Sequence, residues 1–271
     1  MLTFLFWNLN NRPIEDRVRR LATRHEPDVL ILTECAIPAV TMLRTLNTGN
    51  ETGDYHLTDS KCDEVVIYTR FSREFTVPMH ESGRYTIRAI SLPARDQILL
   101  AATHLPSKLF IEEHGQTLEC VGLAEAIRAT ERRAGHSRTV LVGDFNMNPF
   151  EAGISAAMGL HGVMAREVAR RGMRTVQGAS YPFFYNPMWG HFGDASKGPP
   201  GTYYYERADH NVFFWHIFDQ VLIRPSILDA FDNENLMVLT DDGSDSFLSE
   251  RGRPDRRTAS DHLPMVFGLN L

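Results

Sequence analysis

One stretch near the middle of the chain, Thr139 to Pro149, constrains the fold more than any other. Its first four residues are apolar or β-branched and lead into Gly143, which is the pattern of a buried strand. Asp144 and Asn146 follow at the end of this strand, two residues apart, so both side chains face the same mouth of a sheet. Pro149 suits the first turn of a following helix. At a single strand end, an Asx turn that only caps backbone would explain the same residues.

The pattern recurs in five other segments, and this repetition favours a functional site over a simple turn. Each segment carries a polar or ionisable side chain where an apolar strand ends, begins or is interrupted. The residues are Asn8, Glu34, His104, Asp219 and the neighbouring pair Asp261 and His262. A fold that gathers these segments would bring carboxylates, amides and two histidines into one site.

Helical spacing is clearest between residues 117 and 133, where four apolar residues recur on one face: Cys120, Leu123, Ala124 and Ile127. Shorter helices are expected at 38–46, 150–158 and 163–171, and strands at 2–7, 28–34, 64–70, 97–104, 217–223 and 263–269. Strands and helices mix throughout, without an internal repeat or a clear linker. We therefore expect a single domain that spans residues 1–271.

Composition is that of a globular protein, with 43% hydrophobic and 23% charged residues. No apolar run is long enough to cross a bilayer, and the first residues do not have the pattern of a signal peptide. The three cysteines lack metal-ligand spacing and are expected to be reduced thiols in the core. These features predict a cytoplasmic protein with no membrane partner.

The net charge of −6 at pH 7 means that the surface as a whole does not attract polyanions. A phosphate-bearing substrate would need a bound cation or a local basic patch. One candidate patch contains Arg251, Arg253, Arg256 and Arg257. Three acids lie just upstream, so a flexible loop that compensates its own charge is an equally good interpretation: Asp241, Asp242 and Asp245.

Residues 172–216 differ from the rest, because glycine, proline and aromatic residues dominate this segment. A long irregular loop of this kind in a compact domain is usually functional or packed as its own small core. In the packing interpretation most of the rings, such as Trp189 and Tyr204, contact each other. In the functional one, some rings stack on a base or sugar at the substrate side of the site.

The gathered side chains suit phosphodiester hydrolysis with a hard divalent cation. Oxygen ligands dominate, and paired thiolates are absent, which favours Mg²⁺ or Mn²⁺ over structural zinc. In this chemistry a cation offsets charge on the phosphate, a base takes a proton from water, and donors hold the non-bridging oxygens. Asp219 beside a histidine would fix the histidine tautomer and stabilise the imidazolium. The sequence has no Gly-x-Ser-x-Gly elbow and no Walker loop.

In this order, the segments resemble the endonuclease/exonuclease/phosphatase (DNase I-like) superfamily. The resemblance covers nearly the whole chain and rests on six short motifs: Trp7-Asn8-Leu9-Asn10, Leu32-Thr33-Glu34, Thr103-His104-Leu105, Gly143-Asp144-Phe145-Asn146, Phe218-Asp219-Gln220-Val221 and Ser260-Asp261-His262. It implies an α/β (α+β) fold, a four-layer α/β/β/α sandwich. Two packed, mainly antiparallel or mixed sheets would be flanked by helices, with the site where the sheets open.

The resemblance also implies a metal site. Glu34 would hold the divalent metal, Mg²⁺ or Mn²⁺, with Asn10 or Asp261 in its coordination shell. Asn10 departs from the family pattern, since several members have an acid at that position. Either one or two metals are therefore compatible with the sequence.

The remaining residues would contact the substrate or take part in the reaction. By resemblance, Asn8 and Asn146 hold the scissile phosphate, and Asp144 holds the attacking water or the developing charge. His262, paired with Asp219, would act as the base. His104 resembles the phosphate-binding or acid histidine of the deoxyribonuclease and sphingomyelinase branches, where AP endonucleases carry a tyrosine.

The leading interpretation is a metal-dependent nuclease, endo- or exonucleolytic, that acts on DNA or RNA. The second is a phosphatase or phosphodiesterase for a small phosphorylated metabolite or a lipid headgroup. The tryptophan-cysteine-aspartate-arginine run of inositol-polyphosphate 5-phosphatases is missing, since Phe214-Trp215-His216-Ile217 stands before Asp219. Outside enzymes, the fold could serve as a binding module, but the intact set of site carboxylates and His262 argues against that.

Overall fold

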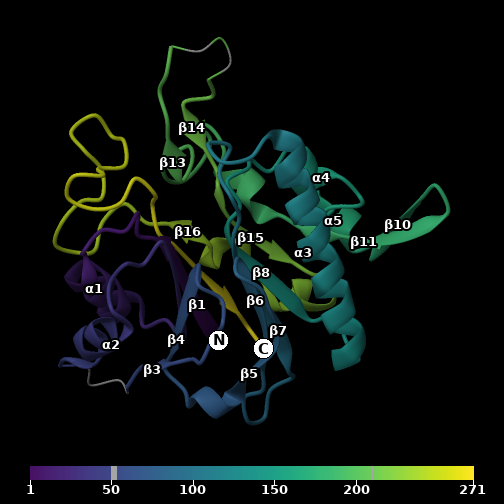
Figure 1. Cartoon of the computed structure of the whole chain (residues 1–271), viewed down its shortest axis with the longest axis horizontal. Coiled ribbons are helices and arrows are strands. Elements are labelled where there is room, and N and C mark those ends of the chain that lie inside the picture. Colours follow the sequence, from purple (N-terminus) through teal and green to yellow (C-terminus); the bar gives the residue numbers. More distant parts are fainter. Residues whose placement is uncertain (50–53, 209, 211) are drawn as a thin grey trace.

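The computed structural model describes residues 1–49, 54–208, 210 and 212–271. Two large β-sheets lie at its centre (Figure 1). The first sheet has six strands, in the order β16 (Met237–Val238), β17 (Met265–Leu269), β1 (Leu2–Asn8), β2 (Val29–Thr33), β4 (Val65–Thr69) and β3 (His56–Leu57). β1 runs parallel to β2, and the other neighbours in this sheet are antiparallel.

The second sheet has seven strands, in the order β5 (Thr76–Glu81), β6 (Tyr85–Ile90), β7 (Ile98–His104), β8 (Thr139–Asp144), β15 (Asp219–Ile223), β12 (Phe184–Tyr185) and β9 (Gly162–Val163). β7 is parallel to β8 and β12 is parallel to β9, whereas the other pairs are antiparallel. Both sheets are therefore mixed, as predicted.

Helices flank the two sheets. α1 (Glu15–His25) and α2 (Ala39–Asn47) lie beside the first sheet, and α3 (Glu113–Ala134) lies beside the second (Figure 1). This arrangement confirms the predicted sandwich, although α3 begins at Glu113 rather than at residue 117. The helices predicted at 150–158 and 163–171 are single turns, α4 (Ala152–Ser155) and α5 (Arg166–Ala169). α4 ends early because the backbone of Ala156 is extended, with φ −68° and ψ 146°.

β8 shows why an uninterrupted apolar run forms a central strand. Val140 and Val142 pack into the core that residues of both sheets share. Leu141 points to the other face, where it packs in a second core with Leu123 and Ile127 of α3. Because successive side chains of a strand alternate between faces, a strand buried on both faces must be apolar at every position.

Gly143 ends this run because β7 approaches too closely for any side chain. A Cβ atom at this position would lie 2.0 Å from the backbone oxygen of Thr103. The close approach brings the ends of β7 and β8 together, next to Asp144.

Residues 172–216 are more regular than expected. They contain the hairpin of β10 (Met173–Val176) and β11 (Ala179–Pro182), the 3₁₀ turn η2 (Pro187–His191), and the hairpin of β13 (Tyr203–Tyr204) and β14 (Trp215–His216). Residues 209 and 211 of this segment lie outside the described residues. The remaining 3₁₀ turns are η1 (Arg73–Phe75), η3 (Pro225–Ala230) and η4 (Asn233–Asn235). In the described part of the chain, no helix is long and apolar enough to span a membrane.

Candidate active site

Strand register brings three of the predicted residues into one row across the second sheet. His104, the last residue of β7, pairs with Asp144, the last residue of β8. Asp144 pairs on its other side with Asp219, the first residue of the antiparallel β15. Three strand termini that are distant in sequence therefore meet at one edge.

The first sheet adds Asn8 and Glu34 to this edge. Asn8 ends β1 beside Thr33, the last residue of β2, and Glu34 follows. The buried side-chain amide of Asn8 donates to Asp144 Oδ2 over 2.9 Å and to Glu34 Oε1 over 3.3 Å. The Ser260 hydroxyl donates to the carbonyl of Asn8 over 2.7 Å, which holds the segment before β17 against β1. Asn8 thus links carboxylates of both sheets.

Three predicted site residues have left-handed backbones, with φ of 47° at Asn10, 44° at Glu34 and 51° at Asn146. Asparagine tolerates this conformation, but for other side chains it costs on the order of 1–3 kcal/mol. At Glu34 the turn is held by the backbone N–H of Asn11, which donates to the Glu34 carbonyl over 2.8 Å. A left-handed residue turns the chain away directly after a strand, so its side chain stays near the end of that strand.

Asp144 lies at the centre of the cluster and is 1% exposed. Its Oδ1 accepts a hydrogen bond of 2.8 Å from the backbone N–H of Asn146. The Nε2 atoms of both histidines approach its Oδ2, to 3.9 Å for His104 and 3.8 Å for His262. The two histidines therefore flank the same carboxylate oxygen.

His262 and Asp219 form a buried pair. Nδ1 of His262 lies 2.9 Å from Oδ2 of Asp219, which has no exposed surface. Burial alone would lower the pKa of His262, but the charges of three nearby aspartates raise it to about 10. The indole of Trp7 donates to the backbone carbonyl of His262 over 2.9 Å and so fixes the backbone that carries the ring. Nε2 is left to face Asp144.

His104 is held by two glutamates. Its Nδ1 lies 2.8 Å from Oε2 of Glu64, and its Nε2 lies 3.4 Å from Oε1 of Glu34. Burial opposes protonation of His104, but these carboxylates and Asp144 raise its pKa to about 9. The contact with His104 also lowers the pKa of Glu34.

Glu64 was not among the predicted site residues. It fits the same pattern, because it is a carboxylate that opens an apolar strand. Its position follows from strand pairing: β4 is antiparallel to β2, and Val65 pairs with Thr33. The start of β4 and the end of β2 therefore meet, which brings Glu64 and Glu34 to the same edge.

The site opens into a cleft that is lined by Glu34, His104 and His262. The three remaining predicted residues line this cleft as well: Asn10, Asn146 and Asp261. The backbone N–H of Asn10 donates to the side-chain oxygen of Asn8 over 2.9 Å. The side-chain amide of Asn146 donates to the carbonyl of Leu105 over 2.9 Å, which leaves one N–H and the amide oxygen for a ligand. Oδ1 of Asp261 is buried and has no hydrogen-bond partner among the described residues.

A sequence model of the Endonuclease/Exonuclease/phosphatase family matches residues 5–262. The chain belongs to this family. Members of the family are metal-dependent phosphoesterases and nucleases, and the chain is a metal-dependent phosphoesterase of this kind. A comparison with curated protein sequences finds no match.

Solved structures share the family fold with this chain at low sequence identity. A family member from Bacteroides thetaiotaomicron has a TM-score of 0.60 at 15% identity, over 99% of this chain and 94% of that one. TDP2 from D. rerio, complexed with a single strand DNA product, has a TM-score of 0.57 at 15% identity, over 100% and 99%. The human Nocturnin catalytic domain with a bound sulfate anion has a TM-score of 0.56 at 15% identity, over 98% and 93%. The likeness confirms the fold.

Family enzymes use divalent metals, and the residues of this chain fit one. Burial raises the pKa of Asp261, and the charge of Glu34 raises it further. A buried carboxylate oxygen without a partner, next to a second carboxylate, is unfavourable unless a cation offsets the charge. Asn10 adds a neutral oxygen in the same cleft, and such oxygen donors are the ligands of hard cations.

A second group of possible ligands is Asp144, Asp219 and His262, whose ligand atoms lie within 4.8 Å of one another. This group differs from the predicted ligands. Asp219 and His262 already bond to each other, and Asp144 already accepts two hydrogen bonds. Because Oδ1 of Asp261 has no partner, the predicted set of Glu34, Asn10 and Asp261 is the better candidate for holding the cation.

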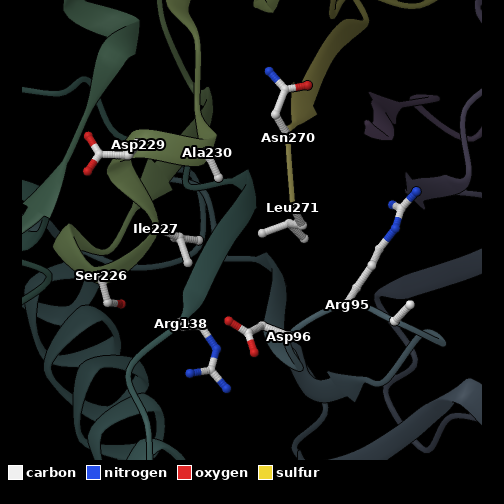
Figure 2. Close-up of a pocket in the computed structure, with 10 residues that line it drawn as sticks. Arg95, Asp96, Arg138, Ser226, Ile227, Asp229, Ala230, Asn270 and Leu271 are labelled. Atoms are coloured by element: carbon white, nitrogen blue, oxygen red, sulfur yellow. The ribbon is translucent and has the colours of Figure 1, made fainter.

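The cleft has a volume of about 1090 Å³, and six of the predicted residues line it: Asn10, Glu34, His104, Asn146, Asp261 and His262. A second pocket, of about 640 Å³, lies at the opposite ends of β8 and β15, where Arg138, Asp96 and Ile227 surround it (Figure 2). None of the predicted site residues lines this second pocket.

Proposed function

We propose that the chain is an Mg²⁺- or Mn²⁺-dependent nuclease that hydrolyses phosphodiester bonds of DNA or RNA. The observation that carries this proposal is the meeting of six chain segments around Asp144 at one end of the two sheets. TDP2 from D. rerio, which shares the fold, was solved with a single strand DNA product. That complex supports a nucleic acid as the substrate here.

Glu34 and Asp261, with Asn10 beside them, would hold the cation. When bound, a divalent cation offsets negative charge on the phosphate. Hard oxygen ligands of this kind suit Mg²⁺ or Mn²⁺. Because nearby carboxylates raise the pKa of His104 and His262, a cation shared by these carboxylates would lower both pKa values again.

In the proposed reaction, Asn146 holds a phosphate oxygen and Asp144 orients the attacking water. Asn8, which was also predicted to hold the phosphate, already donates its amide hydrogens to Asp144 and Glu34, so its role here is to position these two carboxylates. Neutral His262 takes a proton from this water at Nε2. The water oxygen forms the new bond to phosphorus, and the bond between phosphorus and the leaving oxygen breaks. Asp219 keeps Nδ1 of His262 protonated and stabilises the imidazolium that forms. The buried position of this pair supports the role of base, since both groups are held in one orientation.

His104 lies on the other side of Asp144 and is proposed to act on the phosphate or the leaving group. In its protonated form, His104 can bind a phosphate oxygen or give a proton to the departing oxygen. Glu64 contacts Nδ1, so Nε2 is the atom that faces the cleft.

The basic patch predicted at 251–257, here called the arginine segment, supports a polyanionic substrate. The acids upstream do not neutralise it, because they pair with α1 instead. Asp242 pairs with Arg20 at 2.8 Å, and Asp241 pairs with Arg24. Within the part of the chain that the structure describes, three members of the segment form no ion pair: Arg251, Arg256 and Arg257.

Two arginines of the segment lie near the hairpin β13–β14, which contributes Tyr203 to the cleft. Arg253 lies over the ring of Tyr204, with 4.1 Å between guanidinium and centroid, and pairs with Glu206 at 2.7 Å. Burial raises the pKa of Tyr203, a cleft residue, to about 12, and Arg256 is close enough for its charge to oppose this rise. The segment therefore supplies the local positive charge that a protein of net negative charge needs to bind a polyanion.

The size of the cleft is compatible with a polymer. Its volume of about 1090 Å³ lies at the upper end of the range of about 300–1,000 Å³ that is typical of small-molecule sites. We also propose that residues 1–271 form one domain, since residues of both sheets share a core. Three free thiols support the cytoplasm as its compartment: Cys35, Cys62 and Cys120.

The test is hydrolysis of a substrate panel by the purified protein with Mg²⁺ or Mn²⁺. The panel contains single- and double-stranded DNA, RNA, and small phosphomonoesters and phosphodiesters. We expect polynucleotide cleavage that EDTA abolishes and that weakens with added salt, with Asp144→Asn as the inactive control. Turnover of small phosphoesters alone would favour the phosphatase interpretation. No turnover of any substrate would favour a binding module.

A further inference from the structure

An uninterrupted series of ring contacts begins at His262. Tyr203 of β13 lies over the His262 ring, with 4.7 Å between centroids, and stacks on Phe218 at 5.1 Å with 27° between the planes. Phe218 in turn contacts His216 of β14 at 4.7 Å. The hairpin β13–β14, which projects at the top of Figure 1, thus starts directly at the proposed base.

The series continues outward to exposed phenylalanines. His216 contacts Phe213 at 6.1 Å, and Phe213 contacts Phe150 at 5.4 Å. Phe213 is 57% exposed and Phe150 is 37% exposed, and both line the cleft. We call this series the ring wall: Tyr203, Phe218, His216, Phe213 and Phe150.

A hydrogen-bond network fixes the middle of the ring wall. Nδ1 of His216 lies 3.0 Å from the side-chain amide nitrogen of Asn148. The side-chain oxygen of Asn148 accepts from the backbone N–H of Ile217 over 3.0 Å, and its backbone N–H donates to Glu151 over 2.9 Å. Because these groups are already held, a ligand that packs on the wall would lose little of its binding free energy to ordering side chains.

We propose that the ring wall binds unpaired bases of a nucleic acid whose scissile phosphate lies at Asp144. This proposal rests on the proposed nuclease function and assigns it a substrate class, single-stranded DNA or RNA. Every base has a π-face that stacks on an aromatic ring, whereas bases inside a duplex are already stacked on each other. Exposed rings that lead away from the reacting phosphate are therefore suited to a strand whose bases are free.

The charges in the cleft distinguish this substrate from a lipid. Arg84 and Arg207 line the same cleft as the ring wall, and so does Lys108, which pairs with Glu151. Phosphates recur along a polynucleotide, so cations at several points of a cleft can each contact one. A lipid carries its charge at the headgroup alone, and its chains gain nothing from further cations.

Phe213 and its neighbour Phe214 give a matched pair of variants. Both are exposed rings, 57% and 45%, at adjacent positions of one hairpin. Phe213 lines the cleft, whereas Phe214 contacts Tyr204 and does not line it. Phe213→Ala tests the wall, Phe213→Leu keeps apolar volume without a ring, Phe213→Trp restores a ring, and Phe214→Ala is the control.

We expect Phe213→Ala to raise KM for an unpaired oligonucleotide by roughly 5- to 150-fold, the scale of one lost base–ring stack, with kcat retained. Phe213→Leu should behave like alanine and Phe213→Trp like the wild type. Phe214→Ala, and all variants on methyl 4-nitrophenyl phosphate, should show an unchanged KM. The wild type should have a lower KM for the unpaired oligonucleotide than for the same sequence in a duplex.

Equal effects of Phe213→Ala and Phe214→Ala would overturn the proposal, and so would recovery by Phe213→Leu or equal KM values for paired and unpaired strands. Faster turnover of phospholipid vesicles than of any oligonucleotide would also overturn it. If the wild type hydrolyses no polynucleotide, the proposed function fails by itself. The ring wall is then judged by fluorescence anisotropy with a labelled unpaired oligonucleotide, where Phe213→Ala must weaken binding and Phe214→Ala must not.

Discussion

The two histidines that flank Asp144 are held by carboxylates in different ways. Nδ1 of His262 contacts Asp219, which belongs to a central strand and is fully buried. Nδ1 of His104 contacts Glu64, which opens β4 and has 37% of its side chain exposed. Both histidines present Nε2 to the same oxygen of Asp144. The difference between them therefore lies in the partner behind the ring.

Burial decides how strongly each partner holds its histidine. Removing one member of a buried ion pair costs about 3–5 kcal/mol, because the other charge is left without compensation. An exposed ion pair contributes about 0–1 kcal/mol to the free energy of unfolding, since water can replace the partner. His262 is therefore held in one orientation, as a base requires. His104 can exchange Glu64 for water and still contact Glu34 or a phosphate.

The largest effect should come from Glu34, which contacts His104 and whose charge also acts on His262. Glu34→Gln keeps the size of the side chain but removes the charge of a hard-cation ligand. We expect metal affinity, measured by calorimetry, and turnover to fall together, with turnover reaching the level seen in EDTA. Glu113→Gln in the same cleft is the control, and metal binding unchanged by Glu34→Gln would exclude Glu34 as a ligand.

Removal of the buried histidine should come next. His262→Ala is expected to lower kcat by about 10²–10⁴-fold on polynucleotide and minimal phosphodiester alike, the usual contribution of a general base. Divalent-metal affinity should be retained, and added imidazole should restore part of the activity. If His104→Ala lowers kcat more than His262→Ala does on both substrates, His104 rather than His262 is the general base.

These differences show which parts of the site could be predicted from sequence. Asp144, Asp219 and His104 end or open apolar strands, and that local pattern was sufficient to select them. Glu64 has the same pattern, but its role depends on the antiparallel pairing of β2 and β4, which no local pattern specifies. The fold followed from the ordered set of motifs rather than from any one of them.

Long-range packing also explains what sequence left open at the rim of the cleft. Asp242 could have neutralised the arginine segment, but it pairs with Arg17 and Arg20 of α1 instead. Among the aromatic residues, Tyr204 packs against Trp215 at 5.4 Å, whereas Phe213 faces the cleft. Composition cannot distinguish the two rings, because the difference lies in what each ring contacts in the folded chain.

The buried carboxylate should matter less than its histidine. Asp219→Asn is expected to lower kcat by about 100-fold, which corresponds to about 3 kcal/mol for a buried pair that loses one charge. The amide keeps the size of the side chain but no longer stabilises the imidazolium at Nδ1. Steady-state kinetics checks this, and circular dichroism shows whether the variant is folded. A loss below fivefold would mean that His262 does not acquire charge during the reaction.

The smallest effect is expected at the exposed carboxylate, and it tests the comparison most directly. Glu64→Gln is the same kind of change as Asp219→Asn, made behind the other histidine. Because Glu64 is partly exposed and water can replace it, we expect kcat/KM to fall by less than about fivefold. The double variant Glu64→Gln/Asp219→Asn should then show the product of the two single effects, measured as kcat/KM on one oligonucleotide. A loss as large as that of Asp219→Asn would show that His104 needs its anionic partner as much as His262 does, and that burial is not what separates the two pairs.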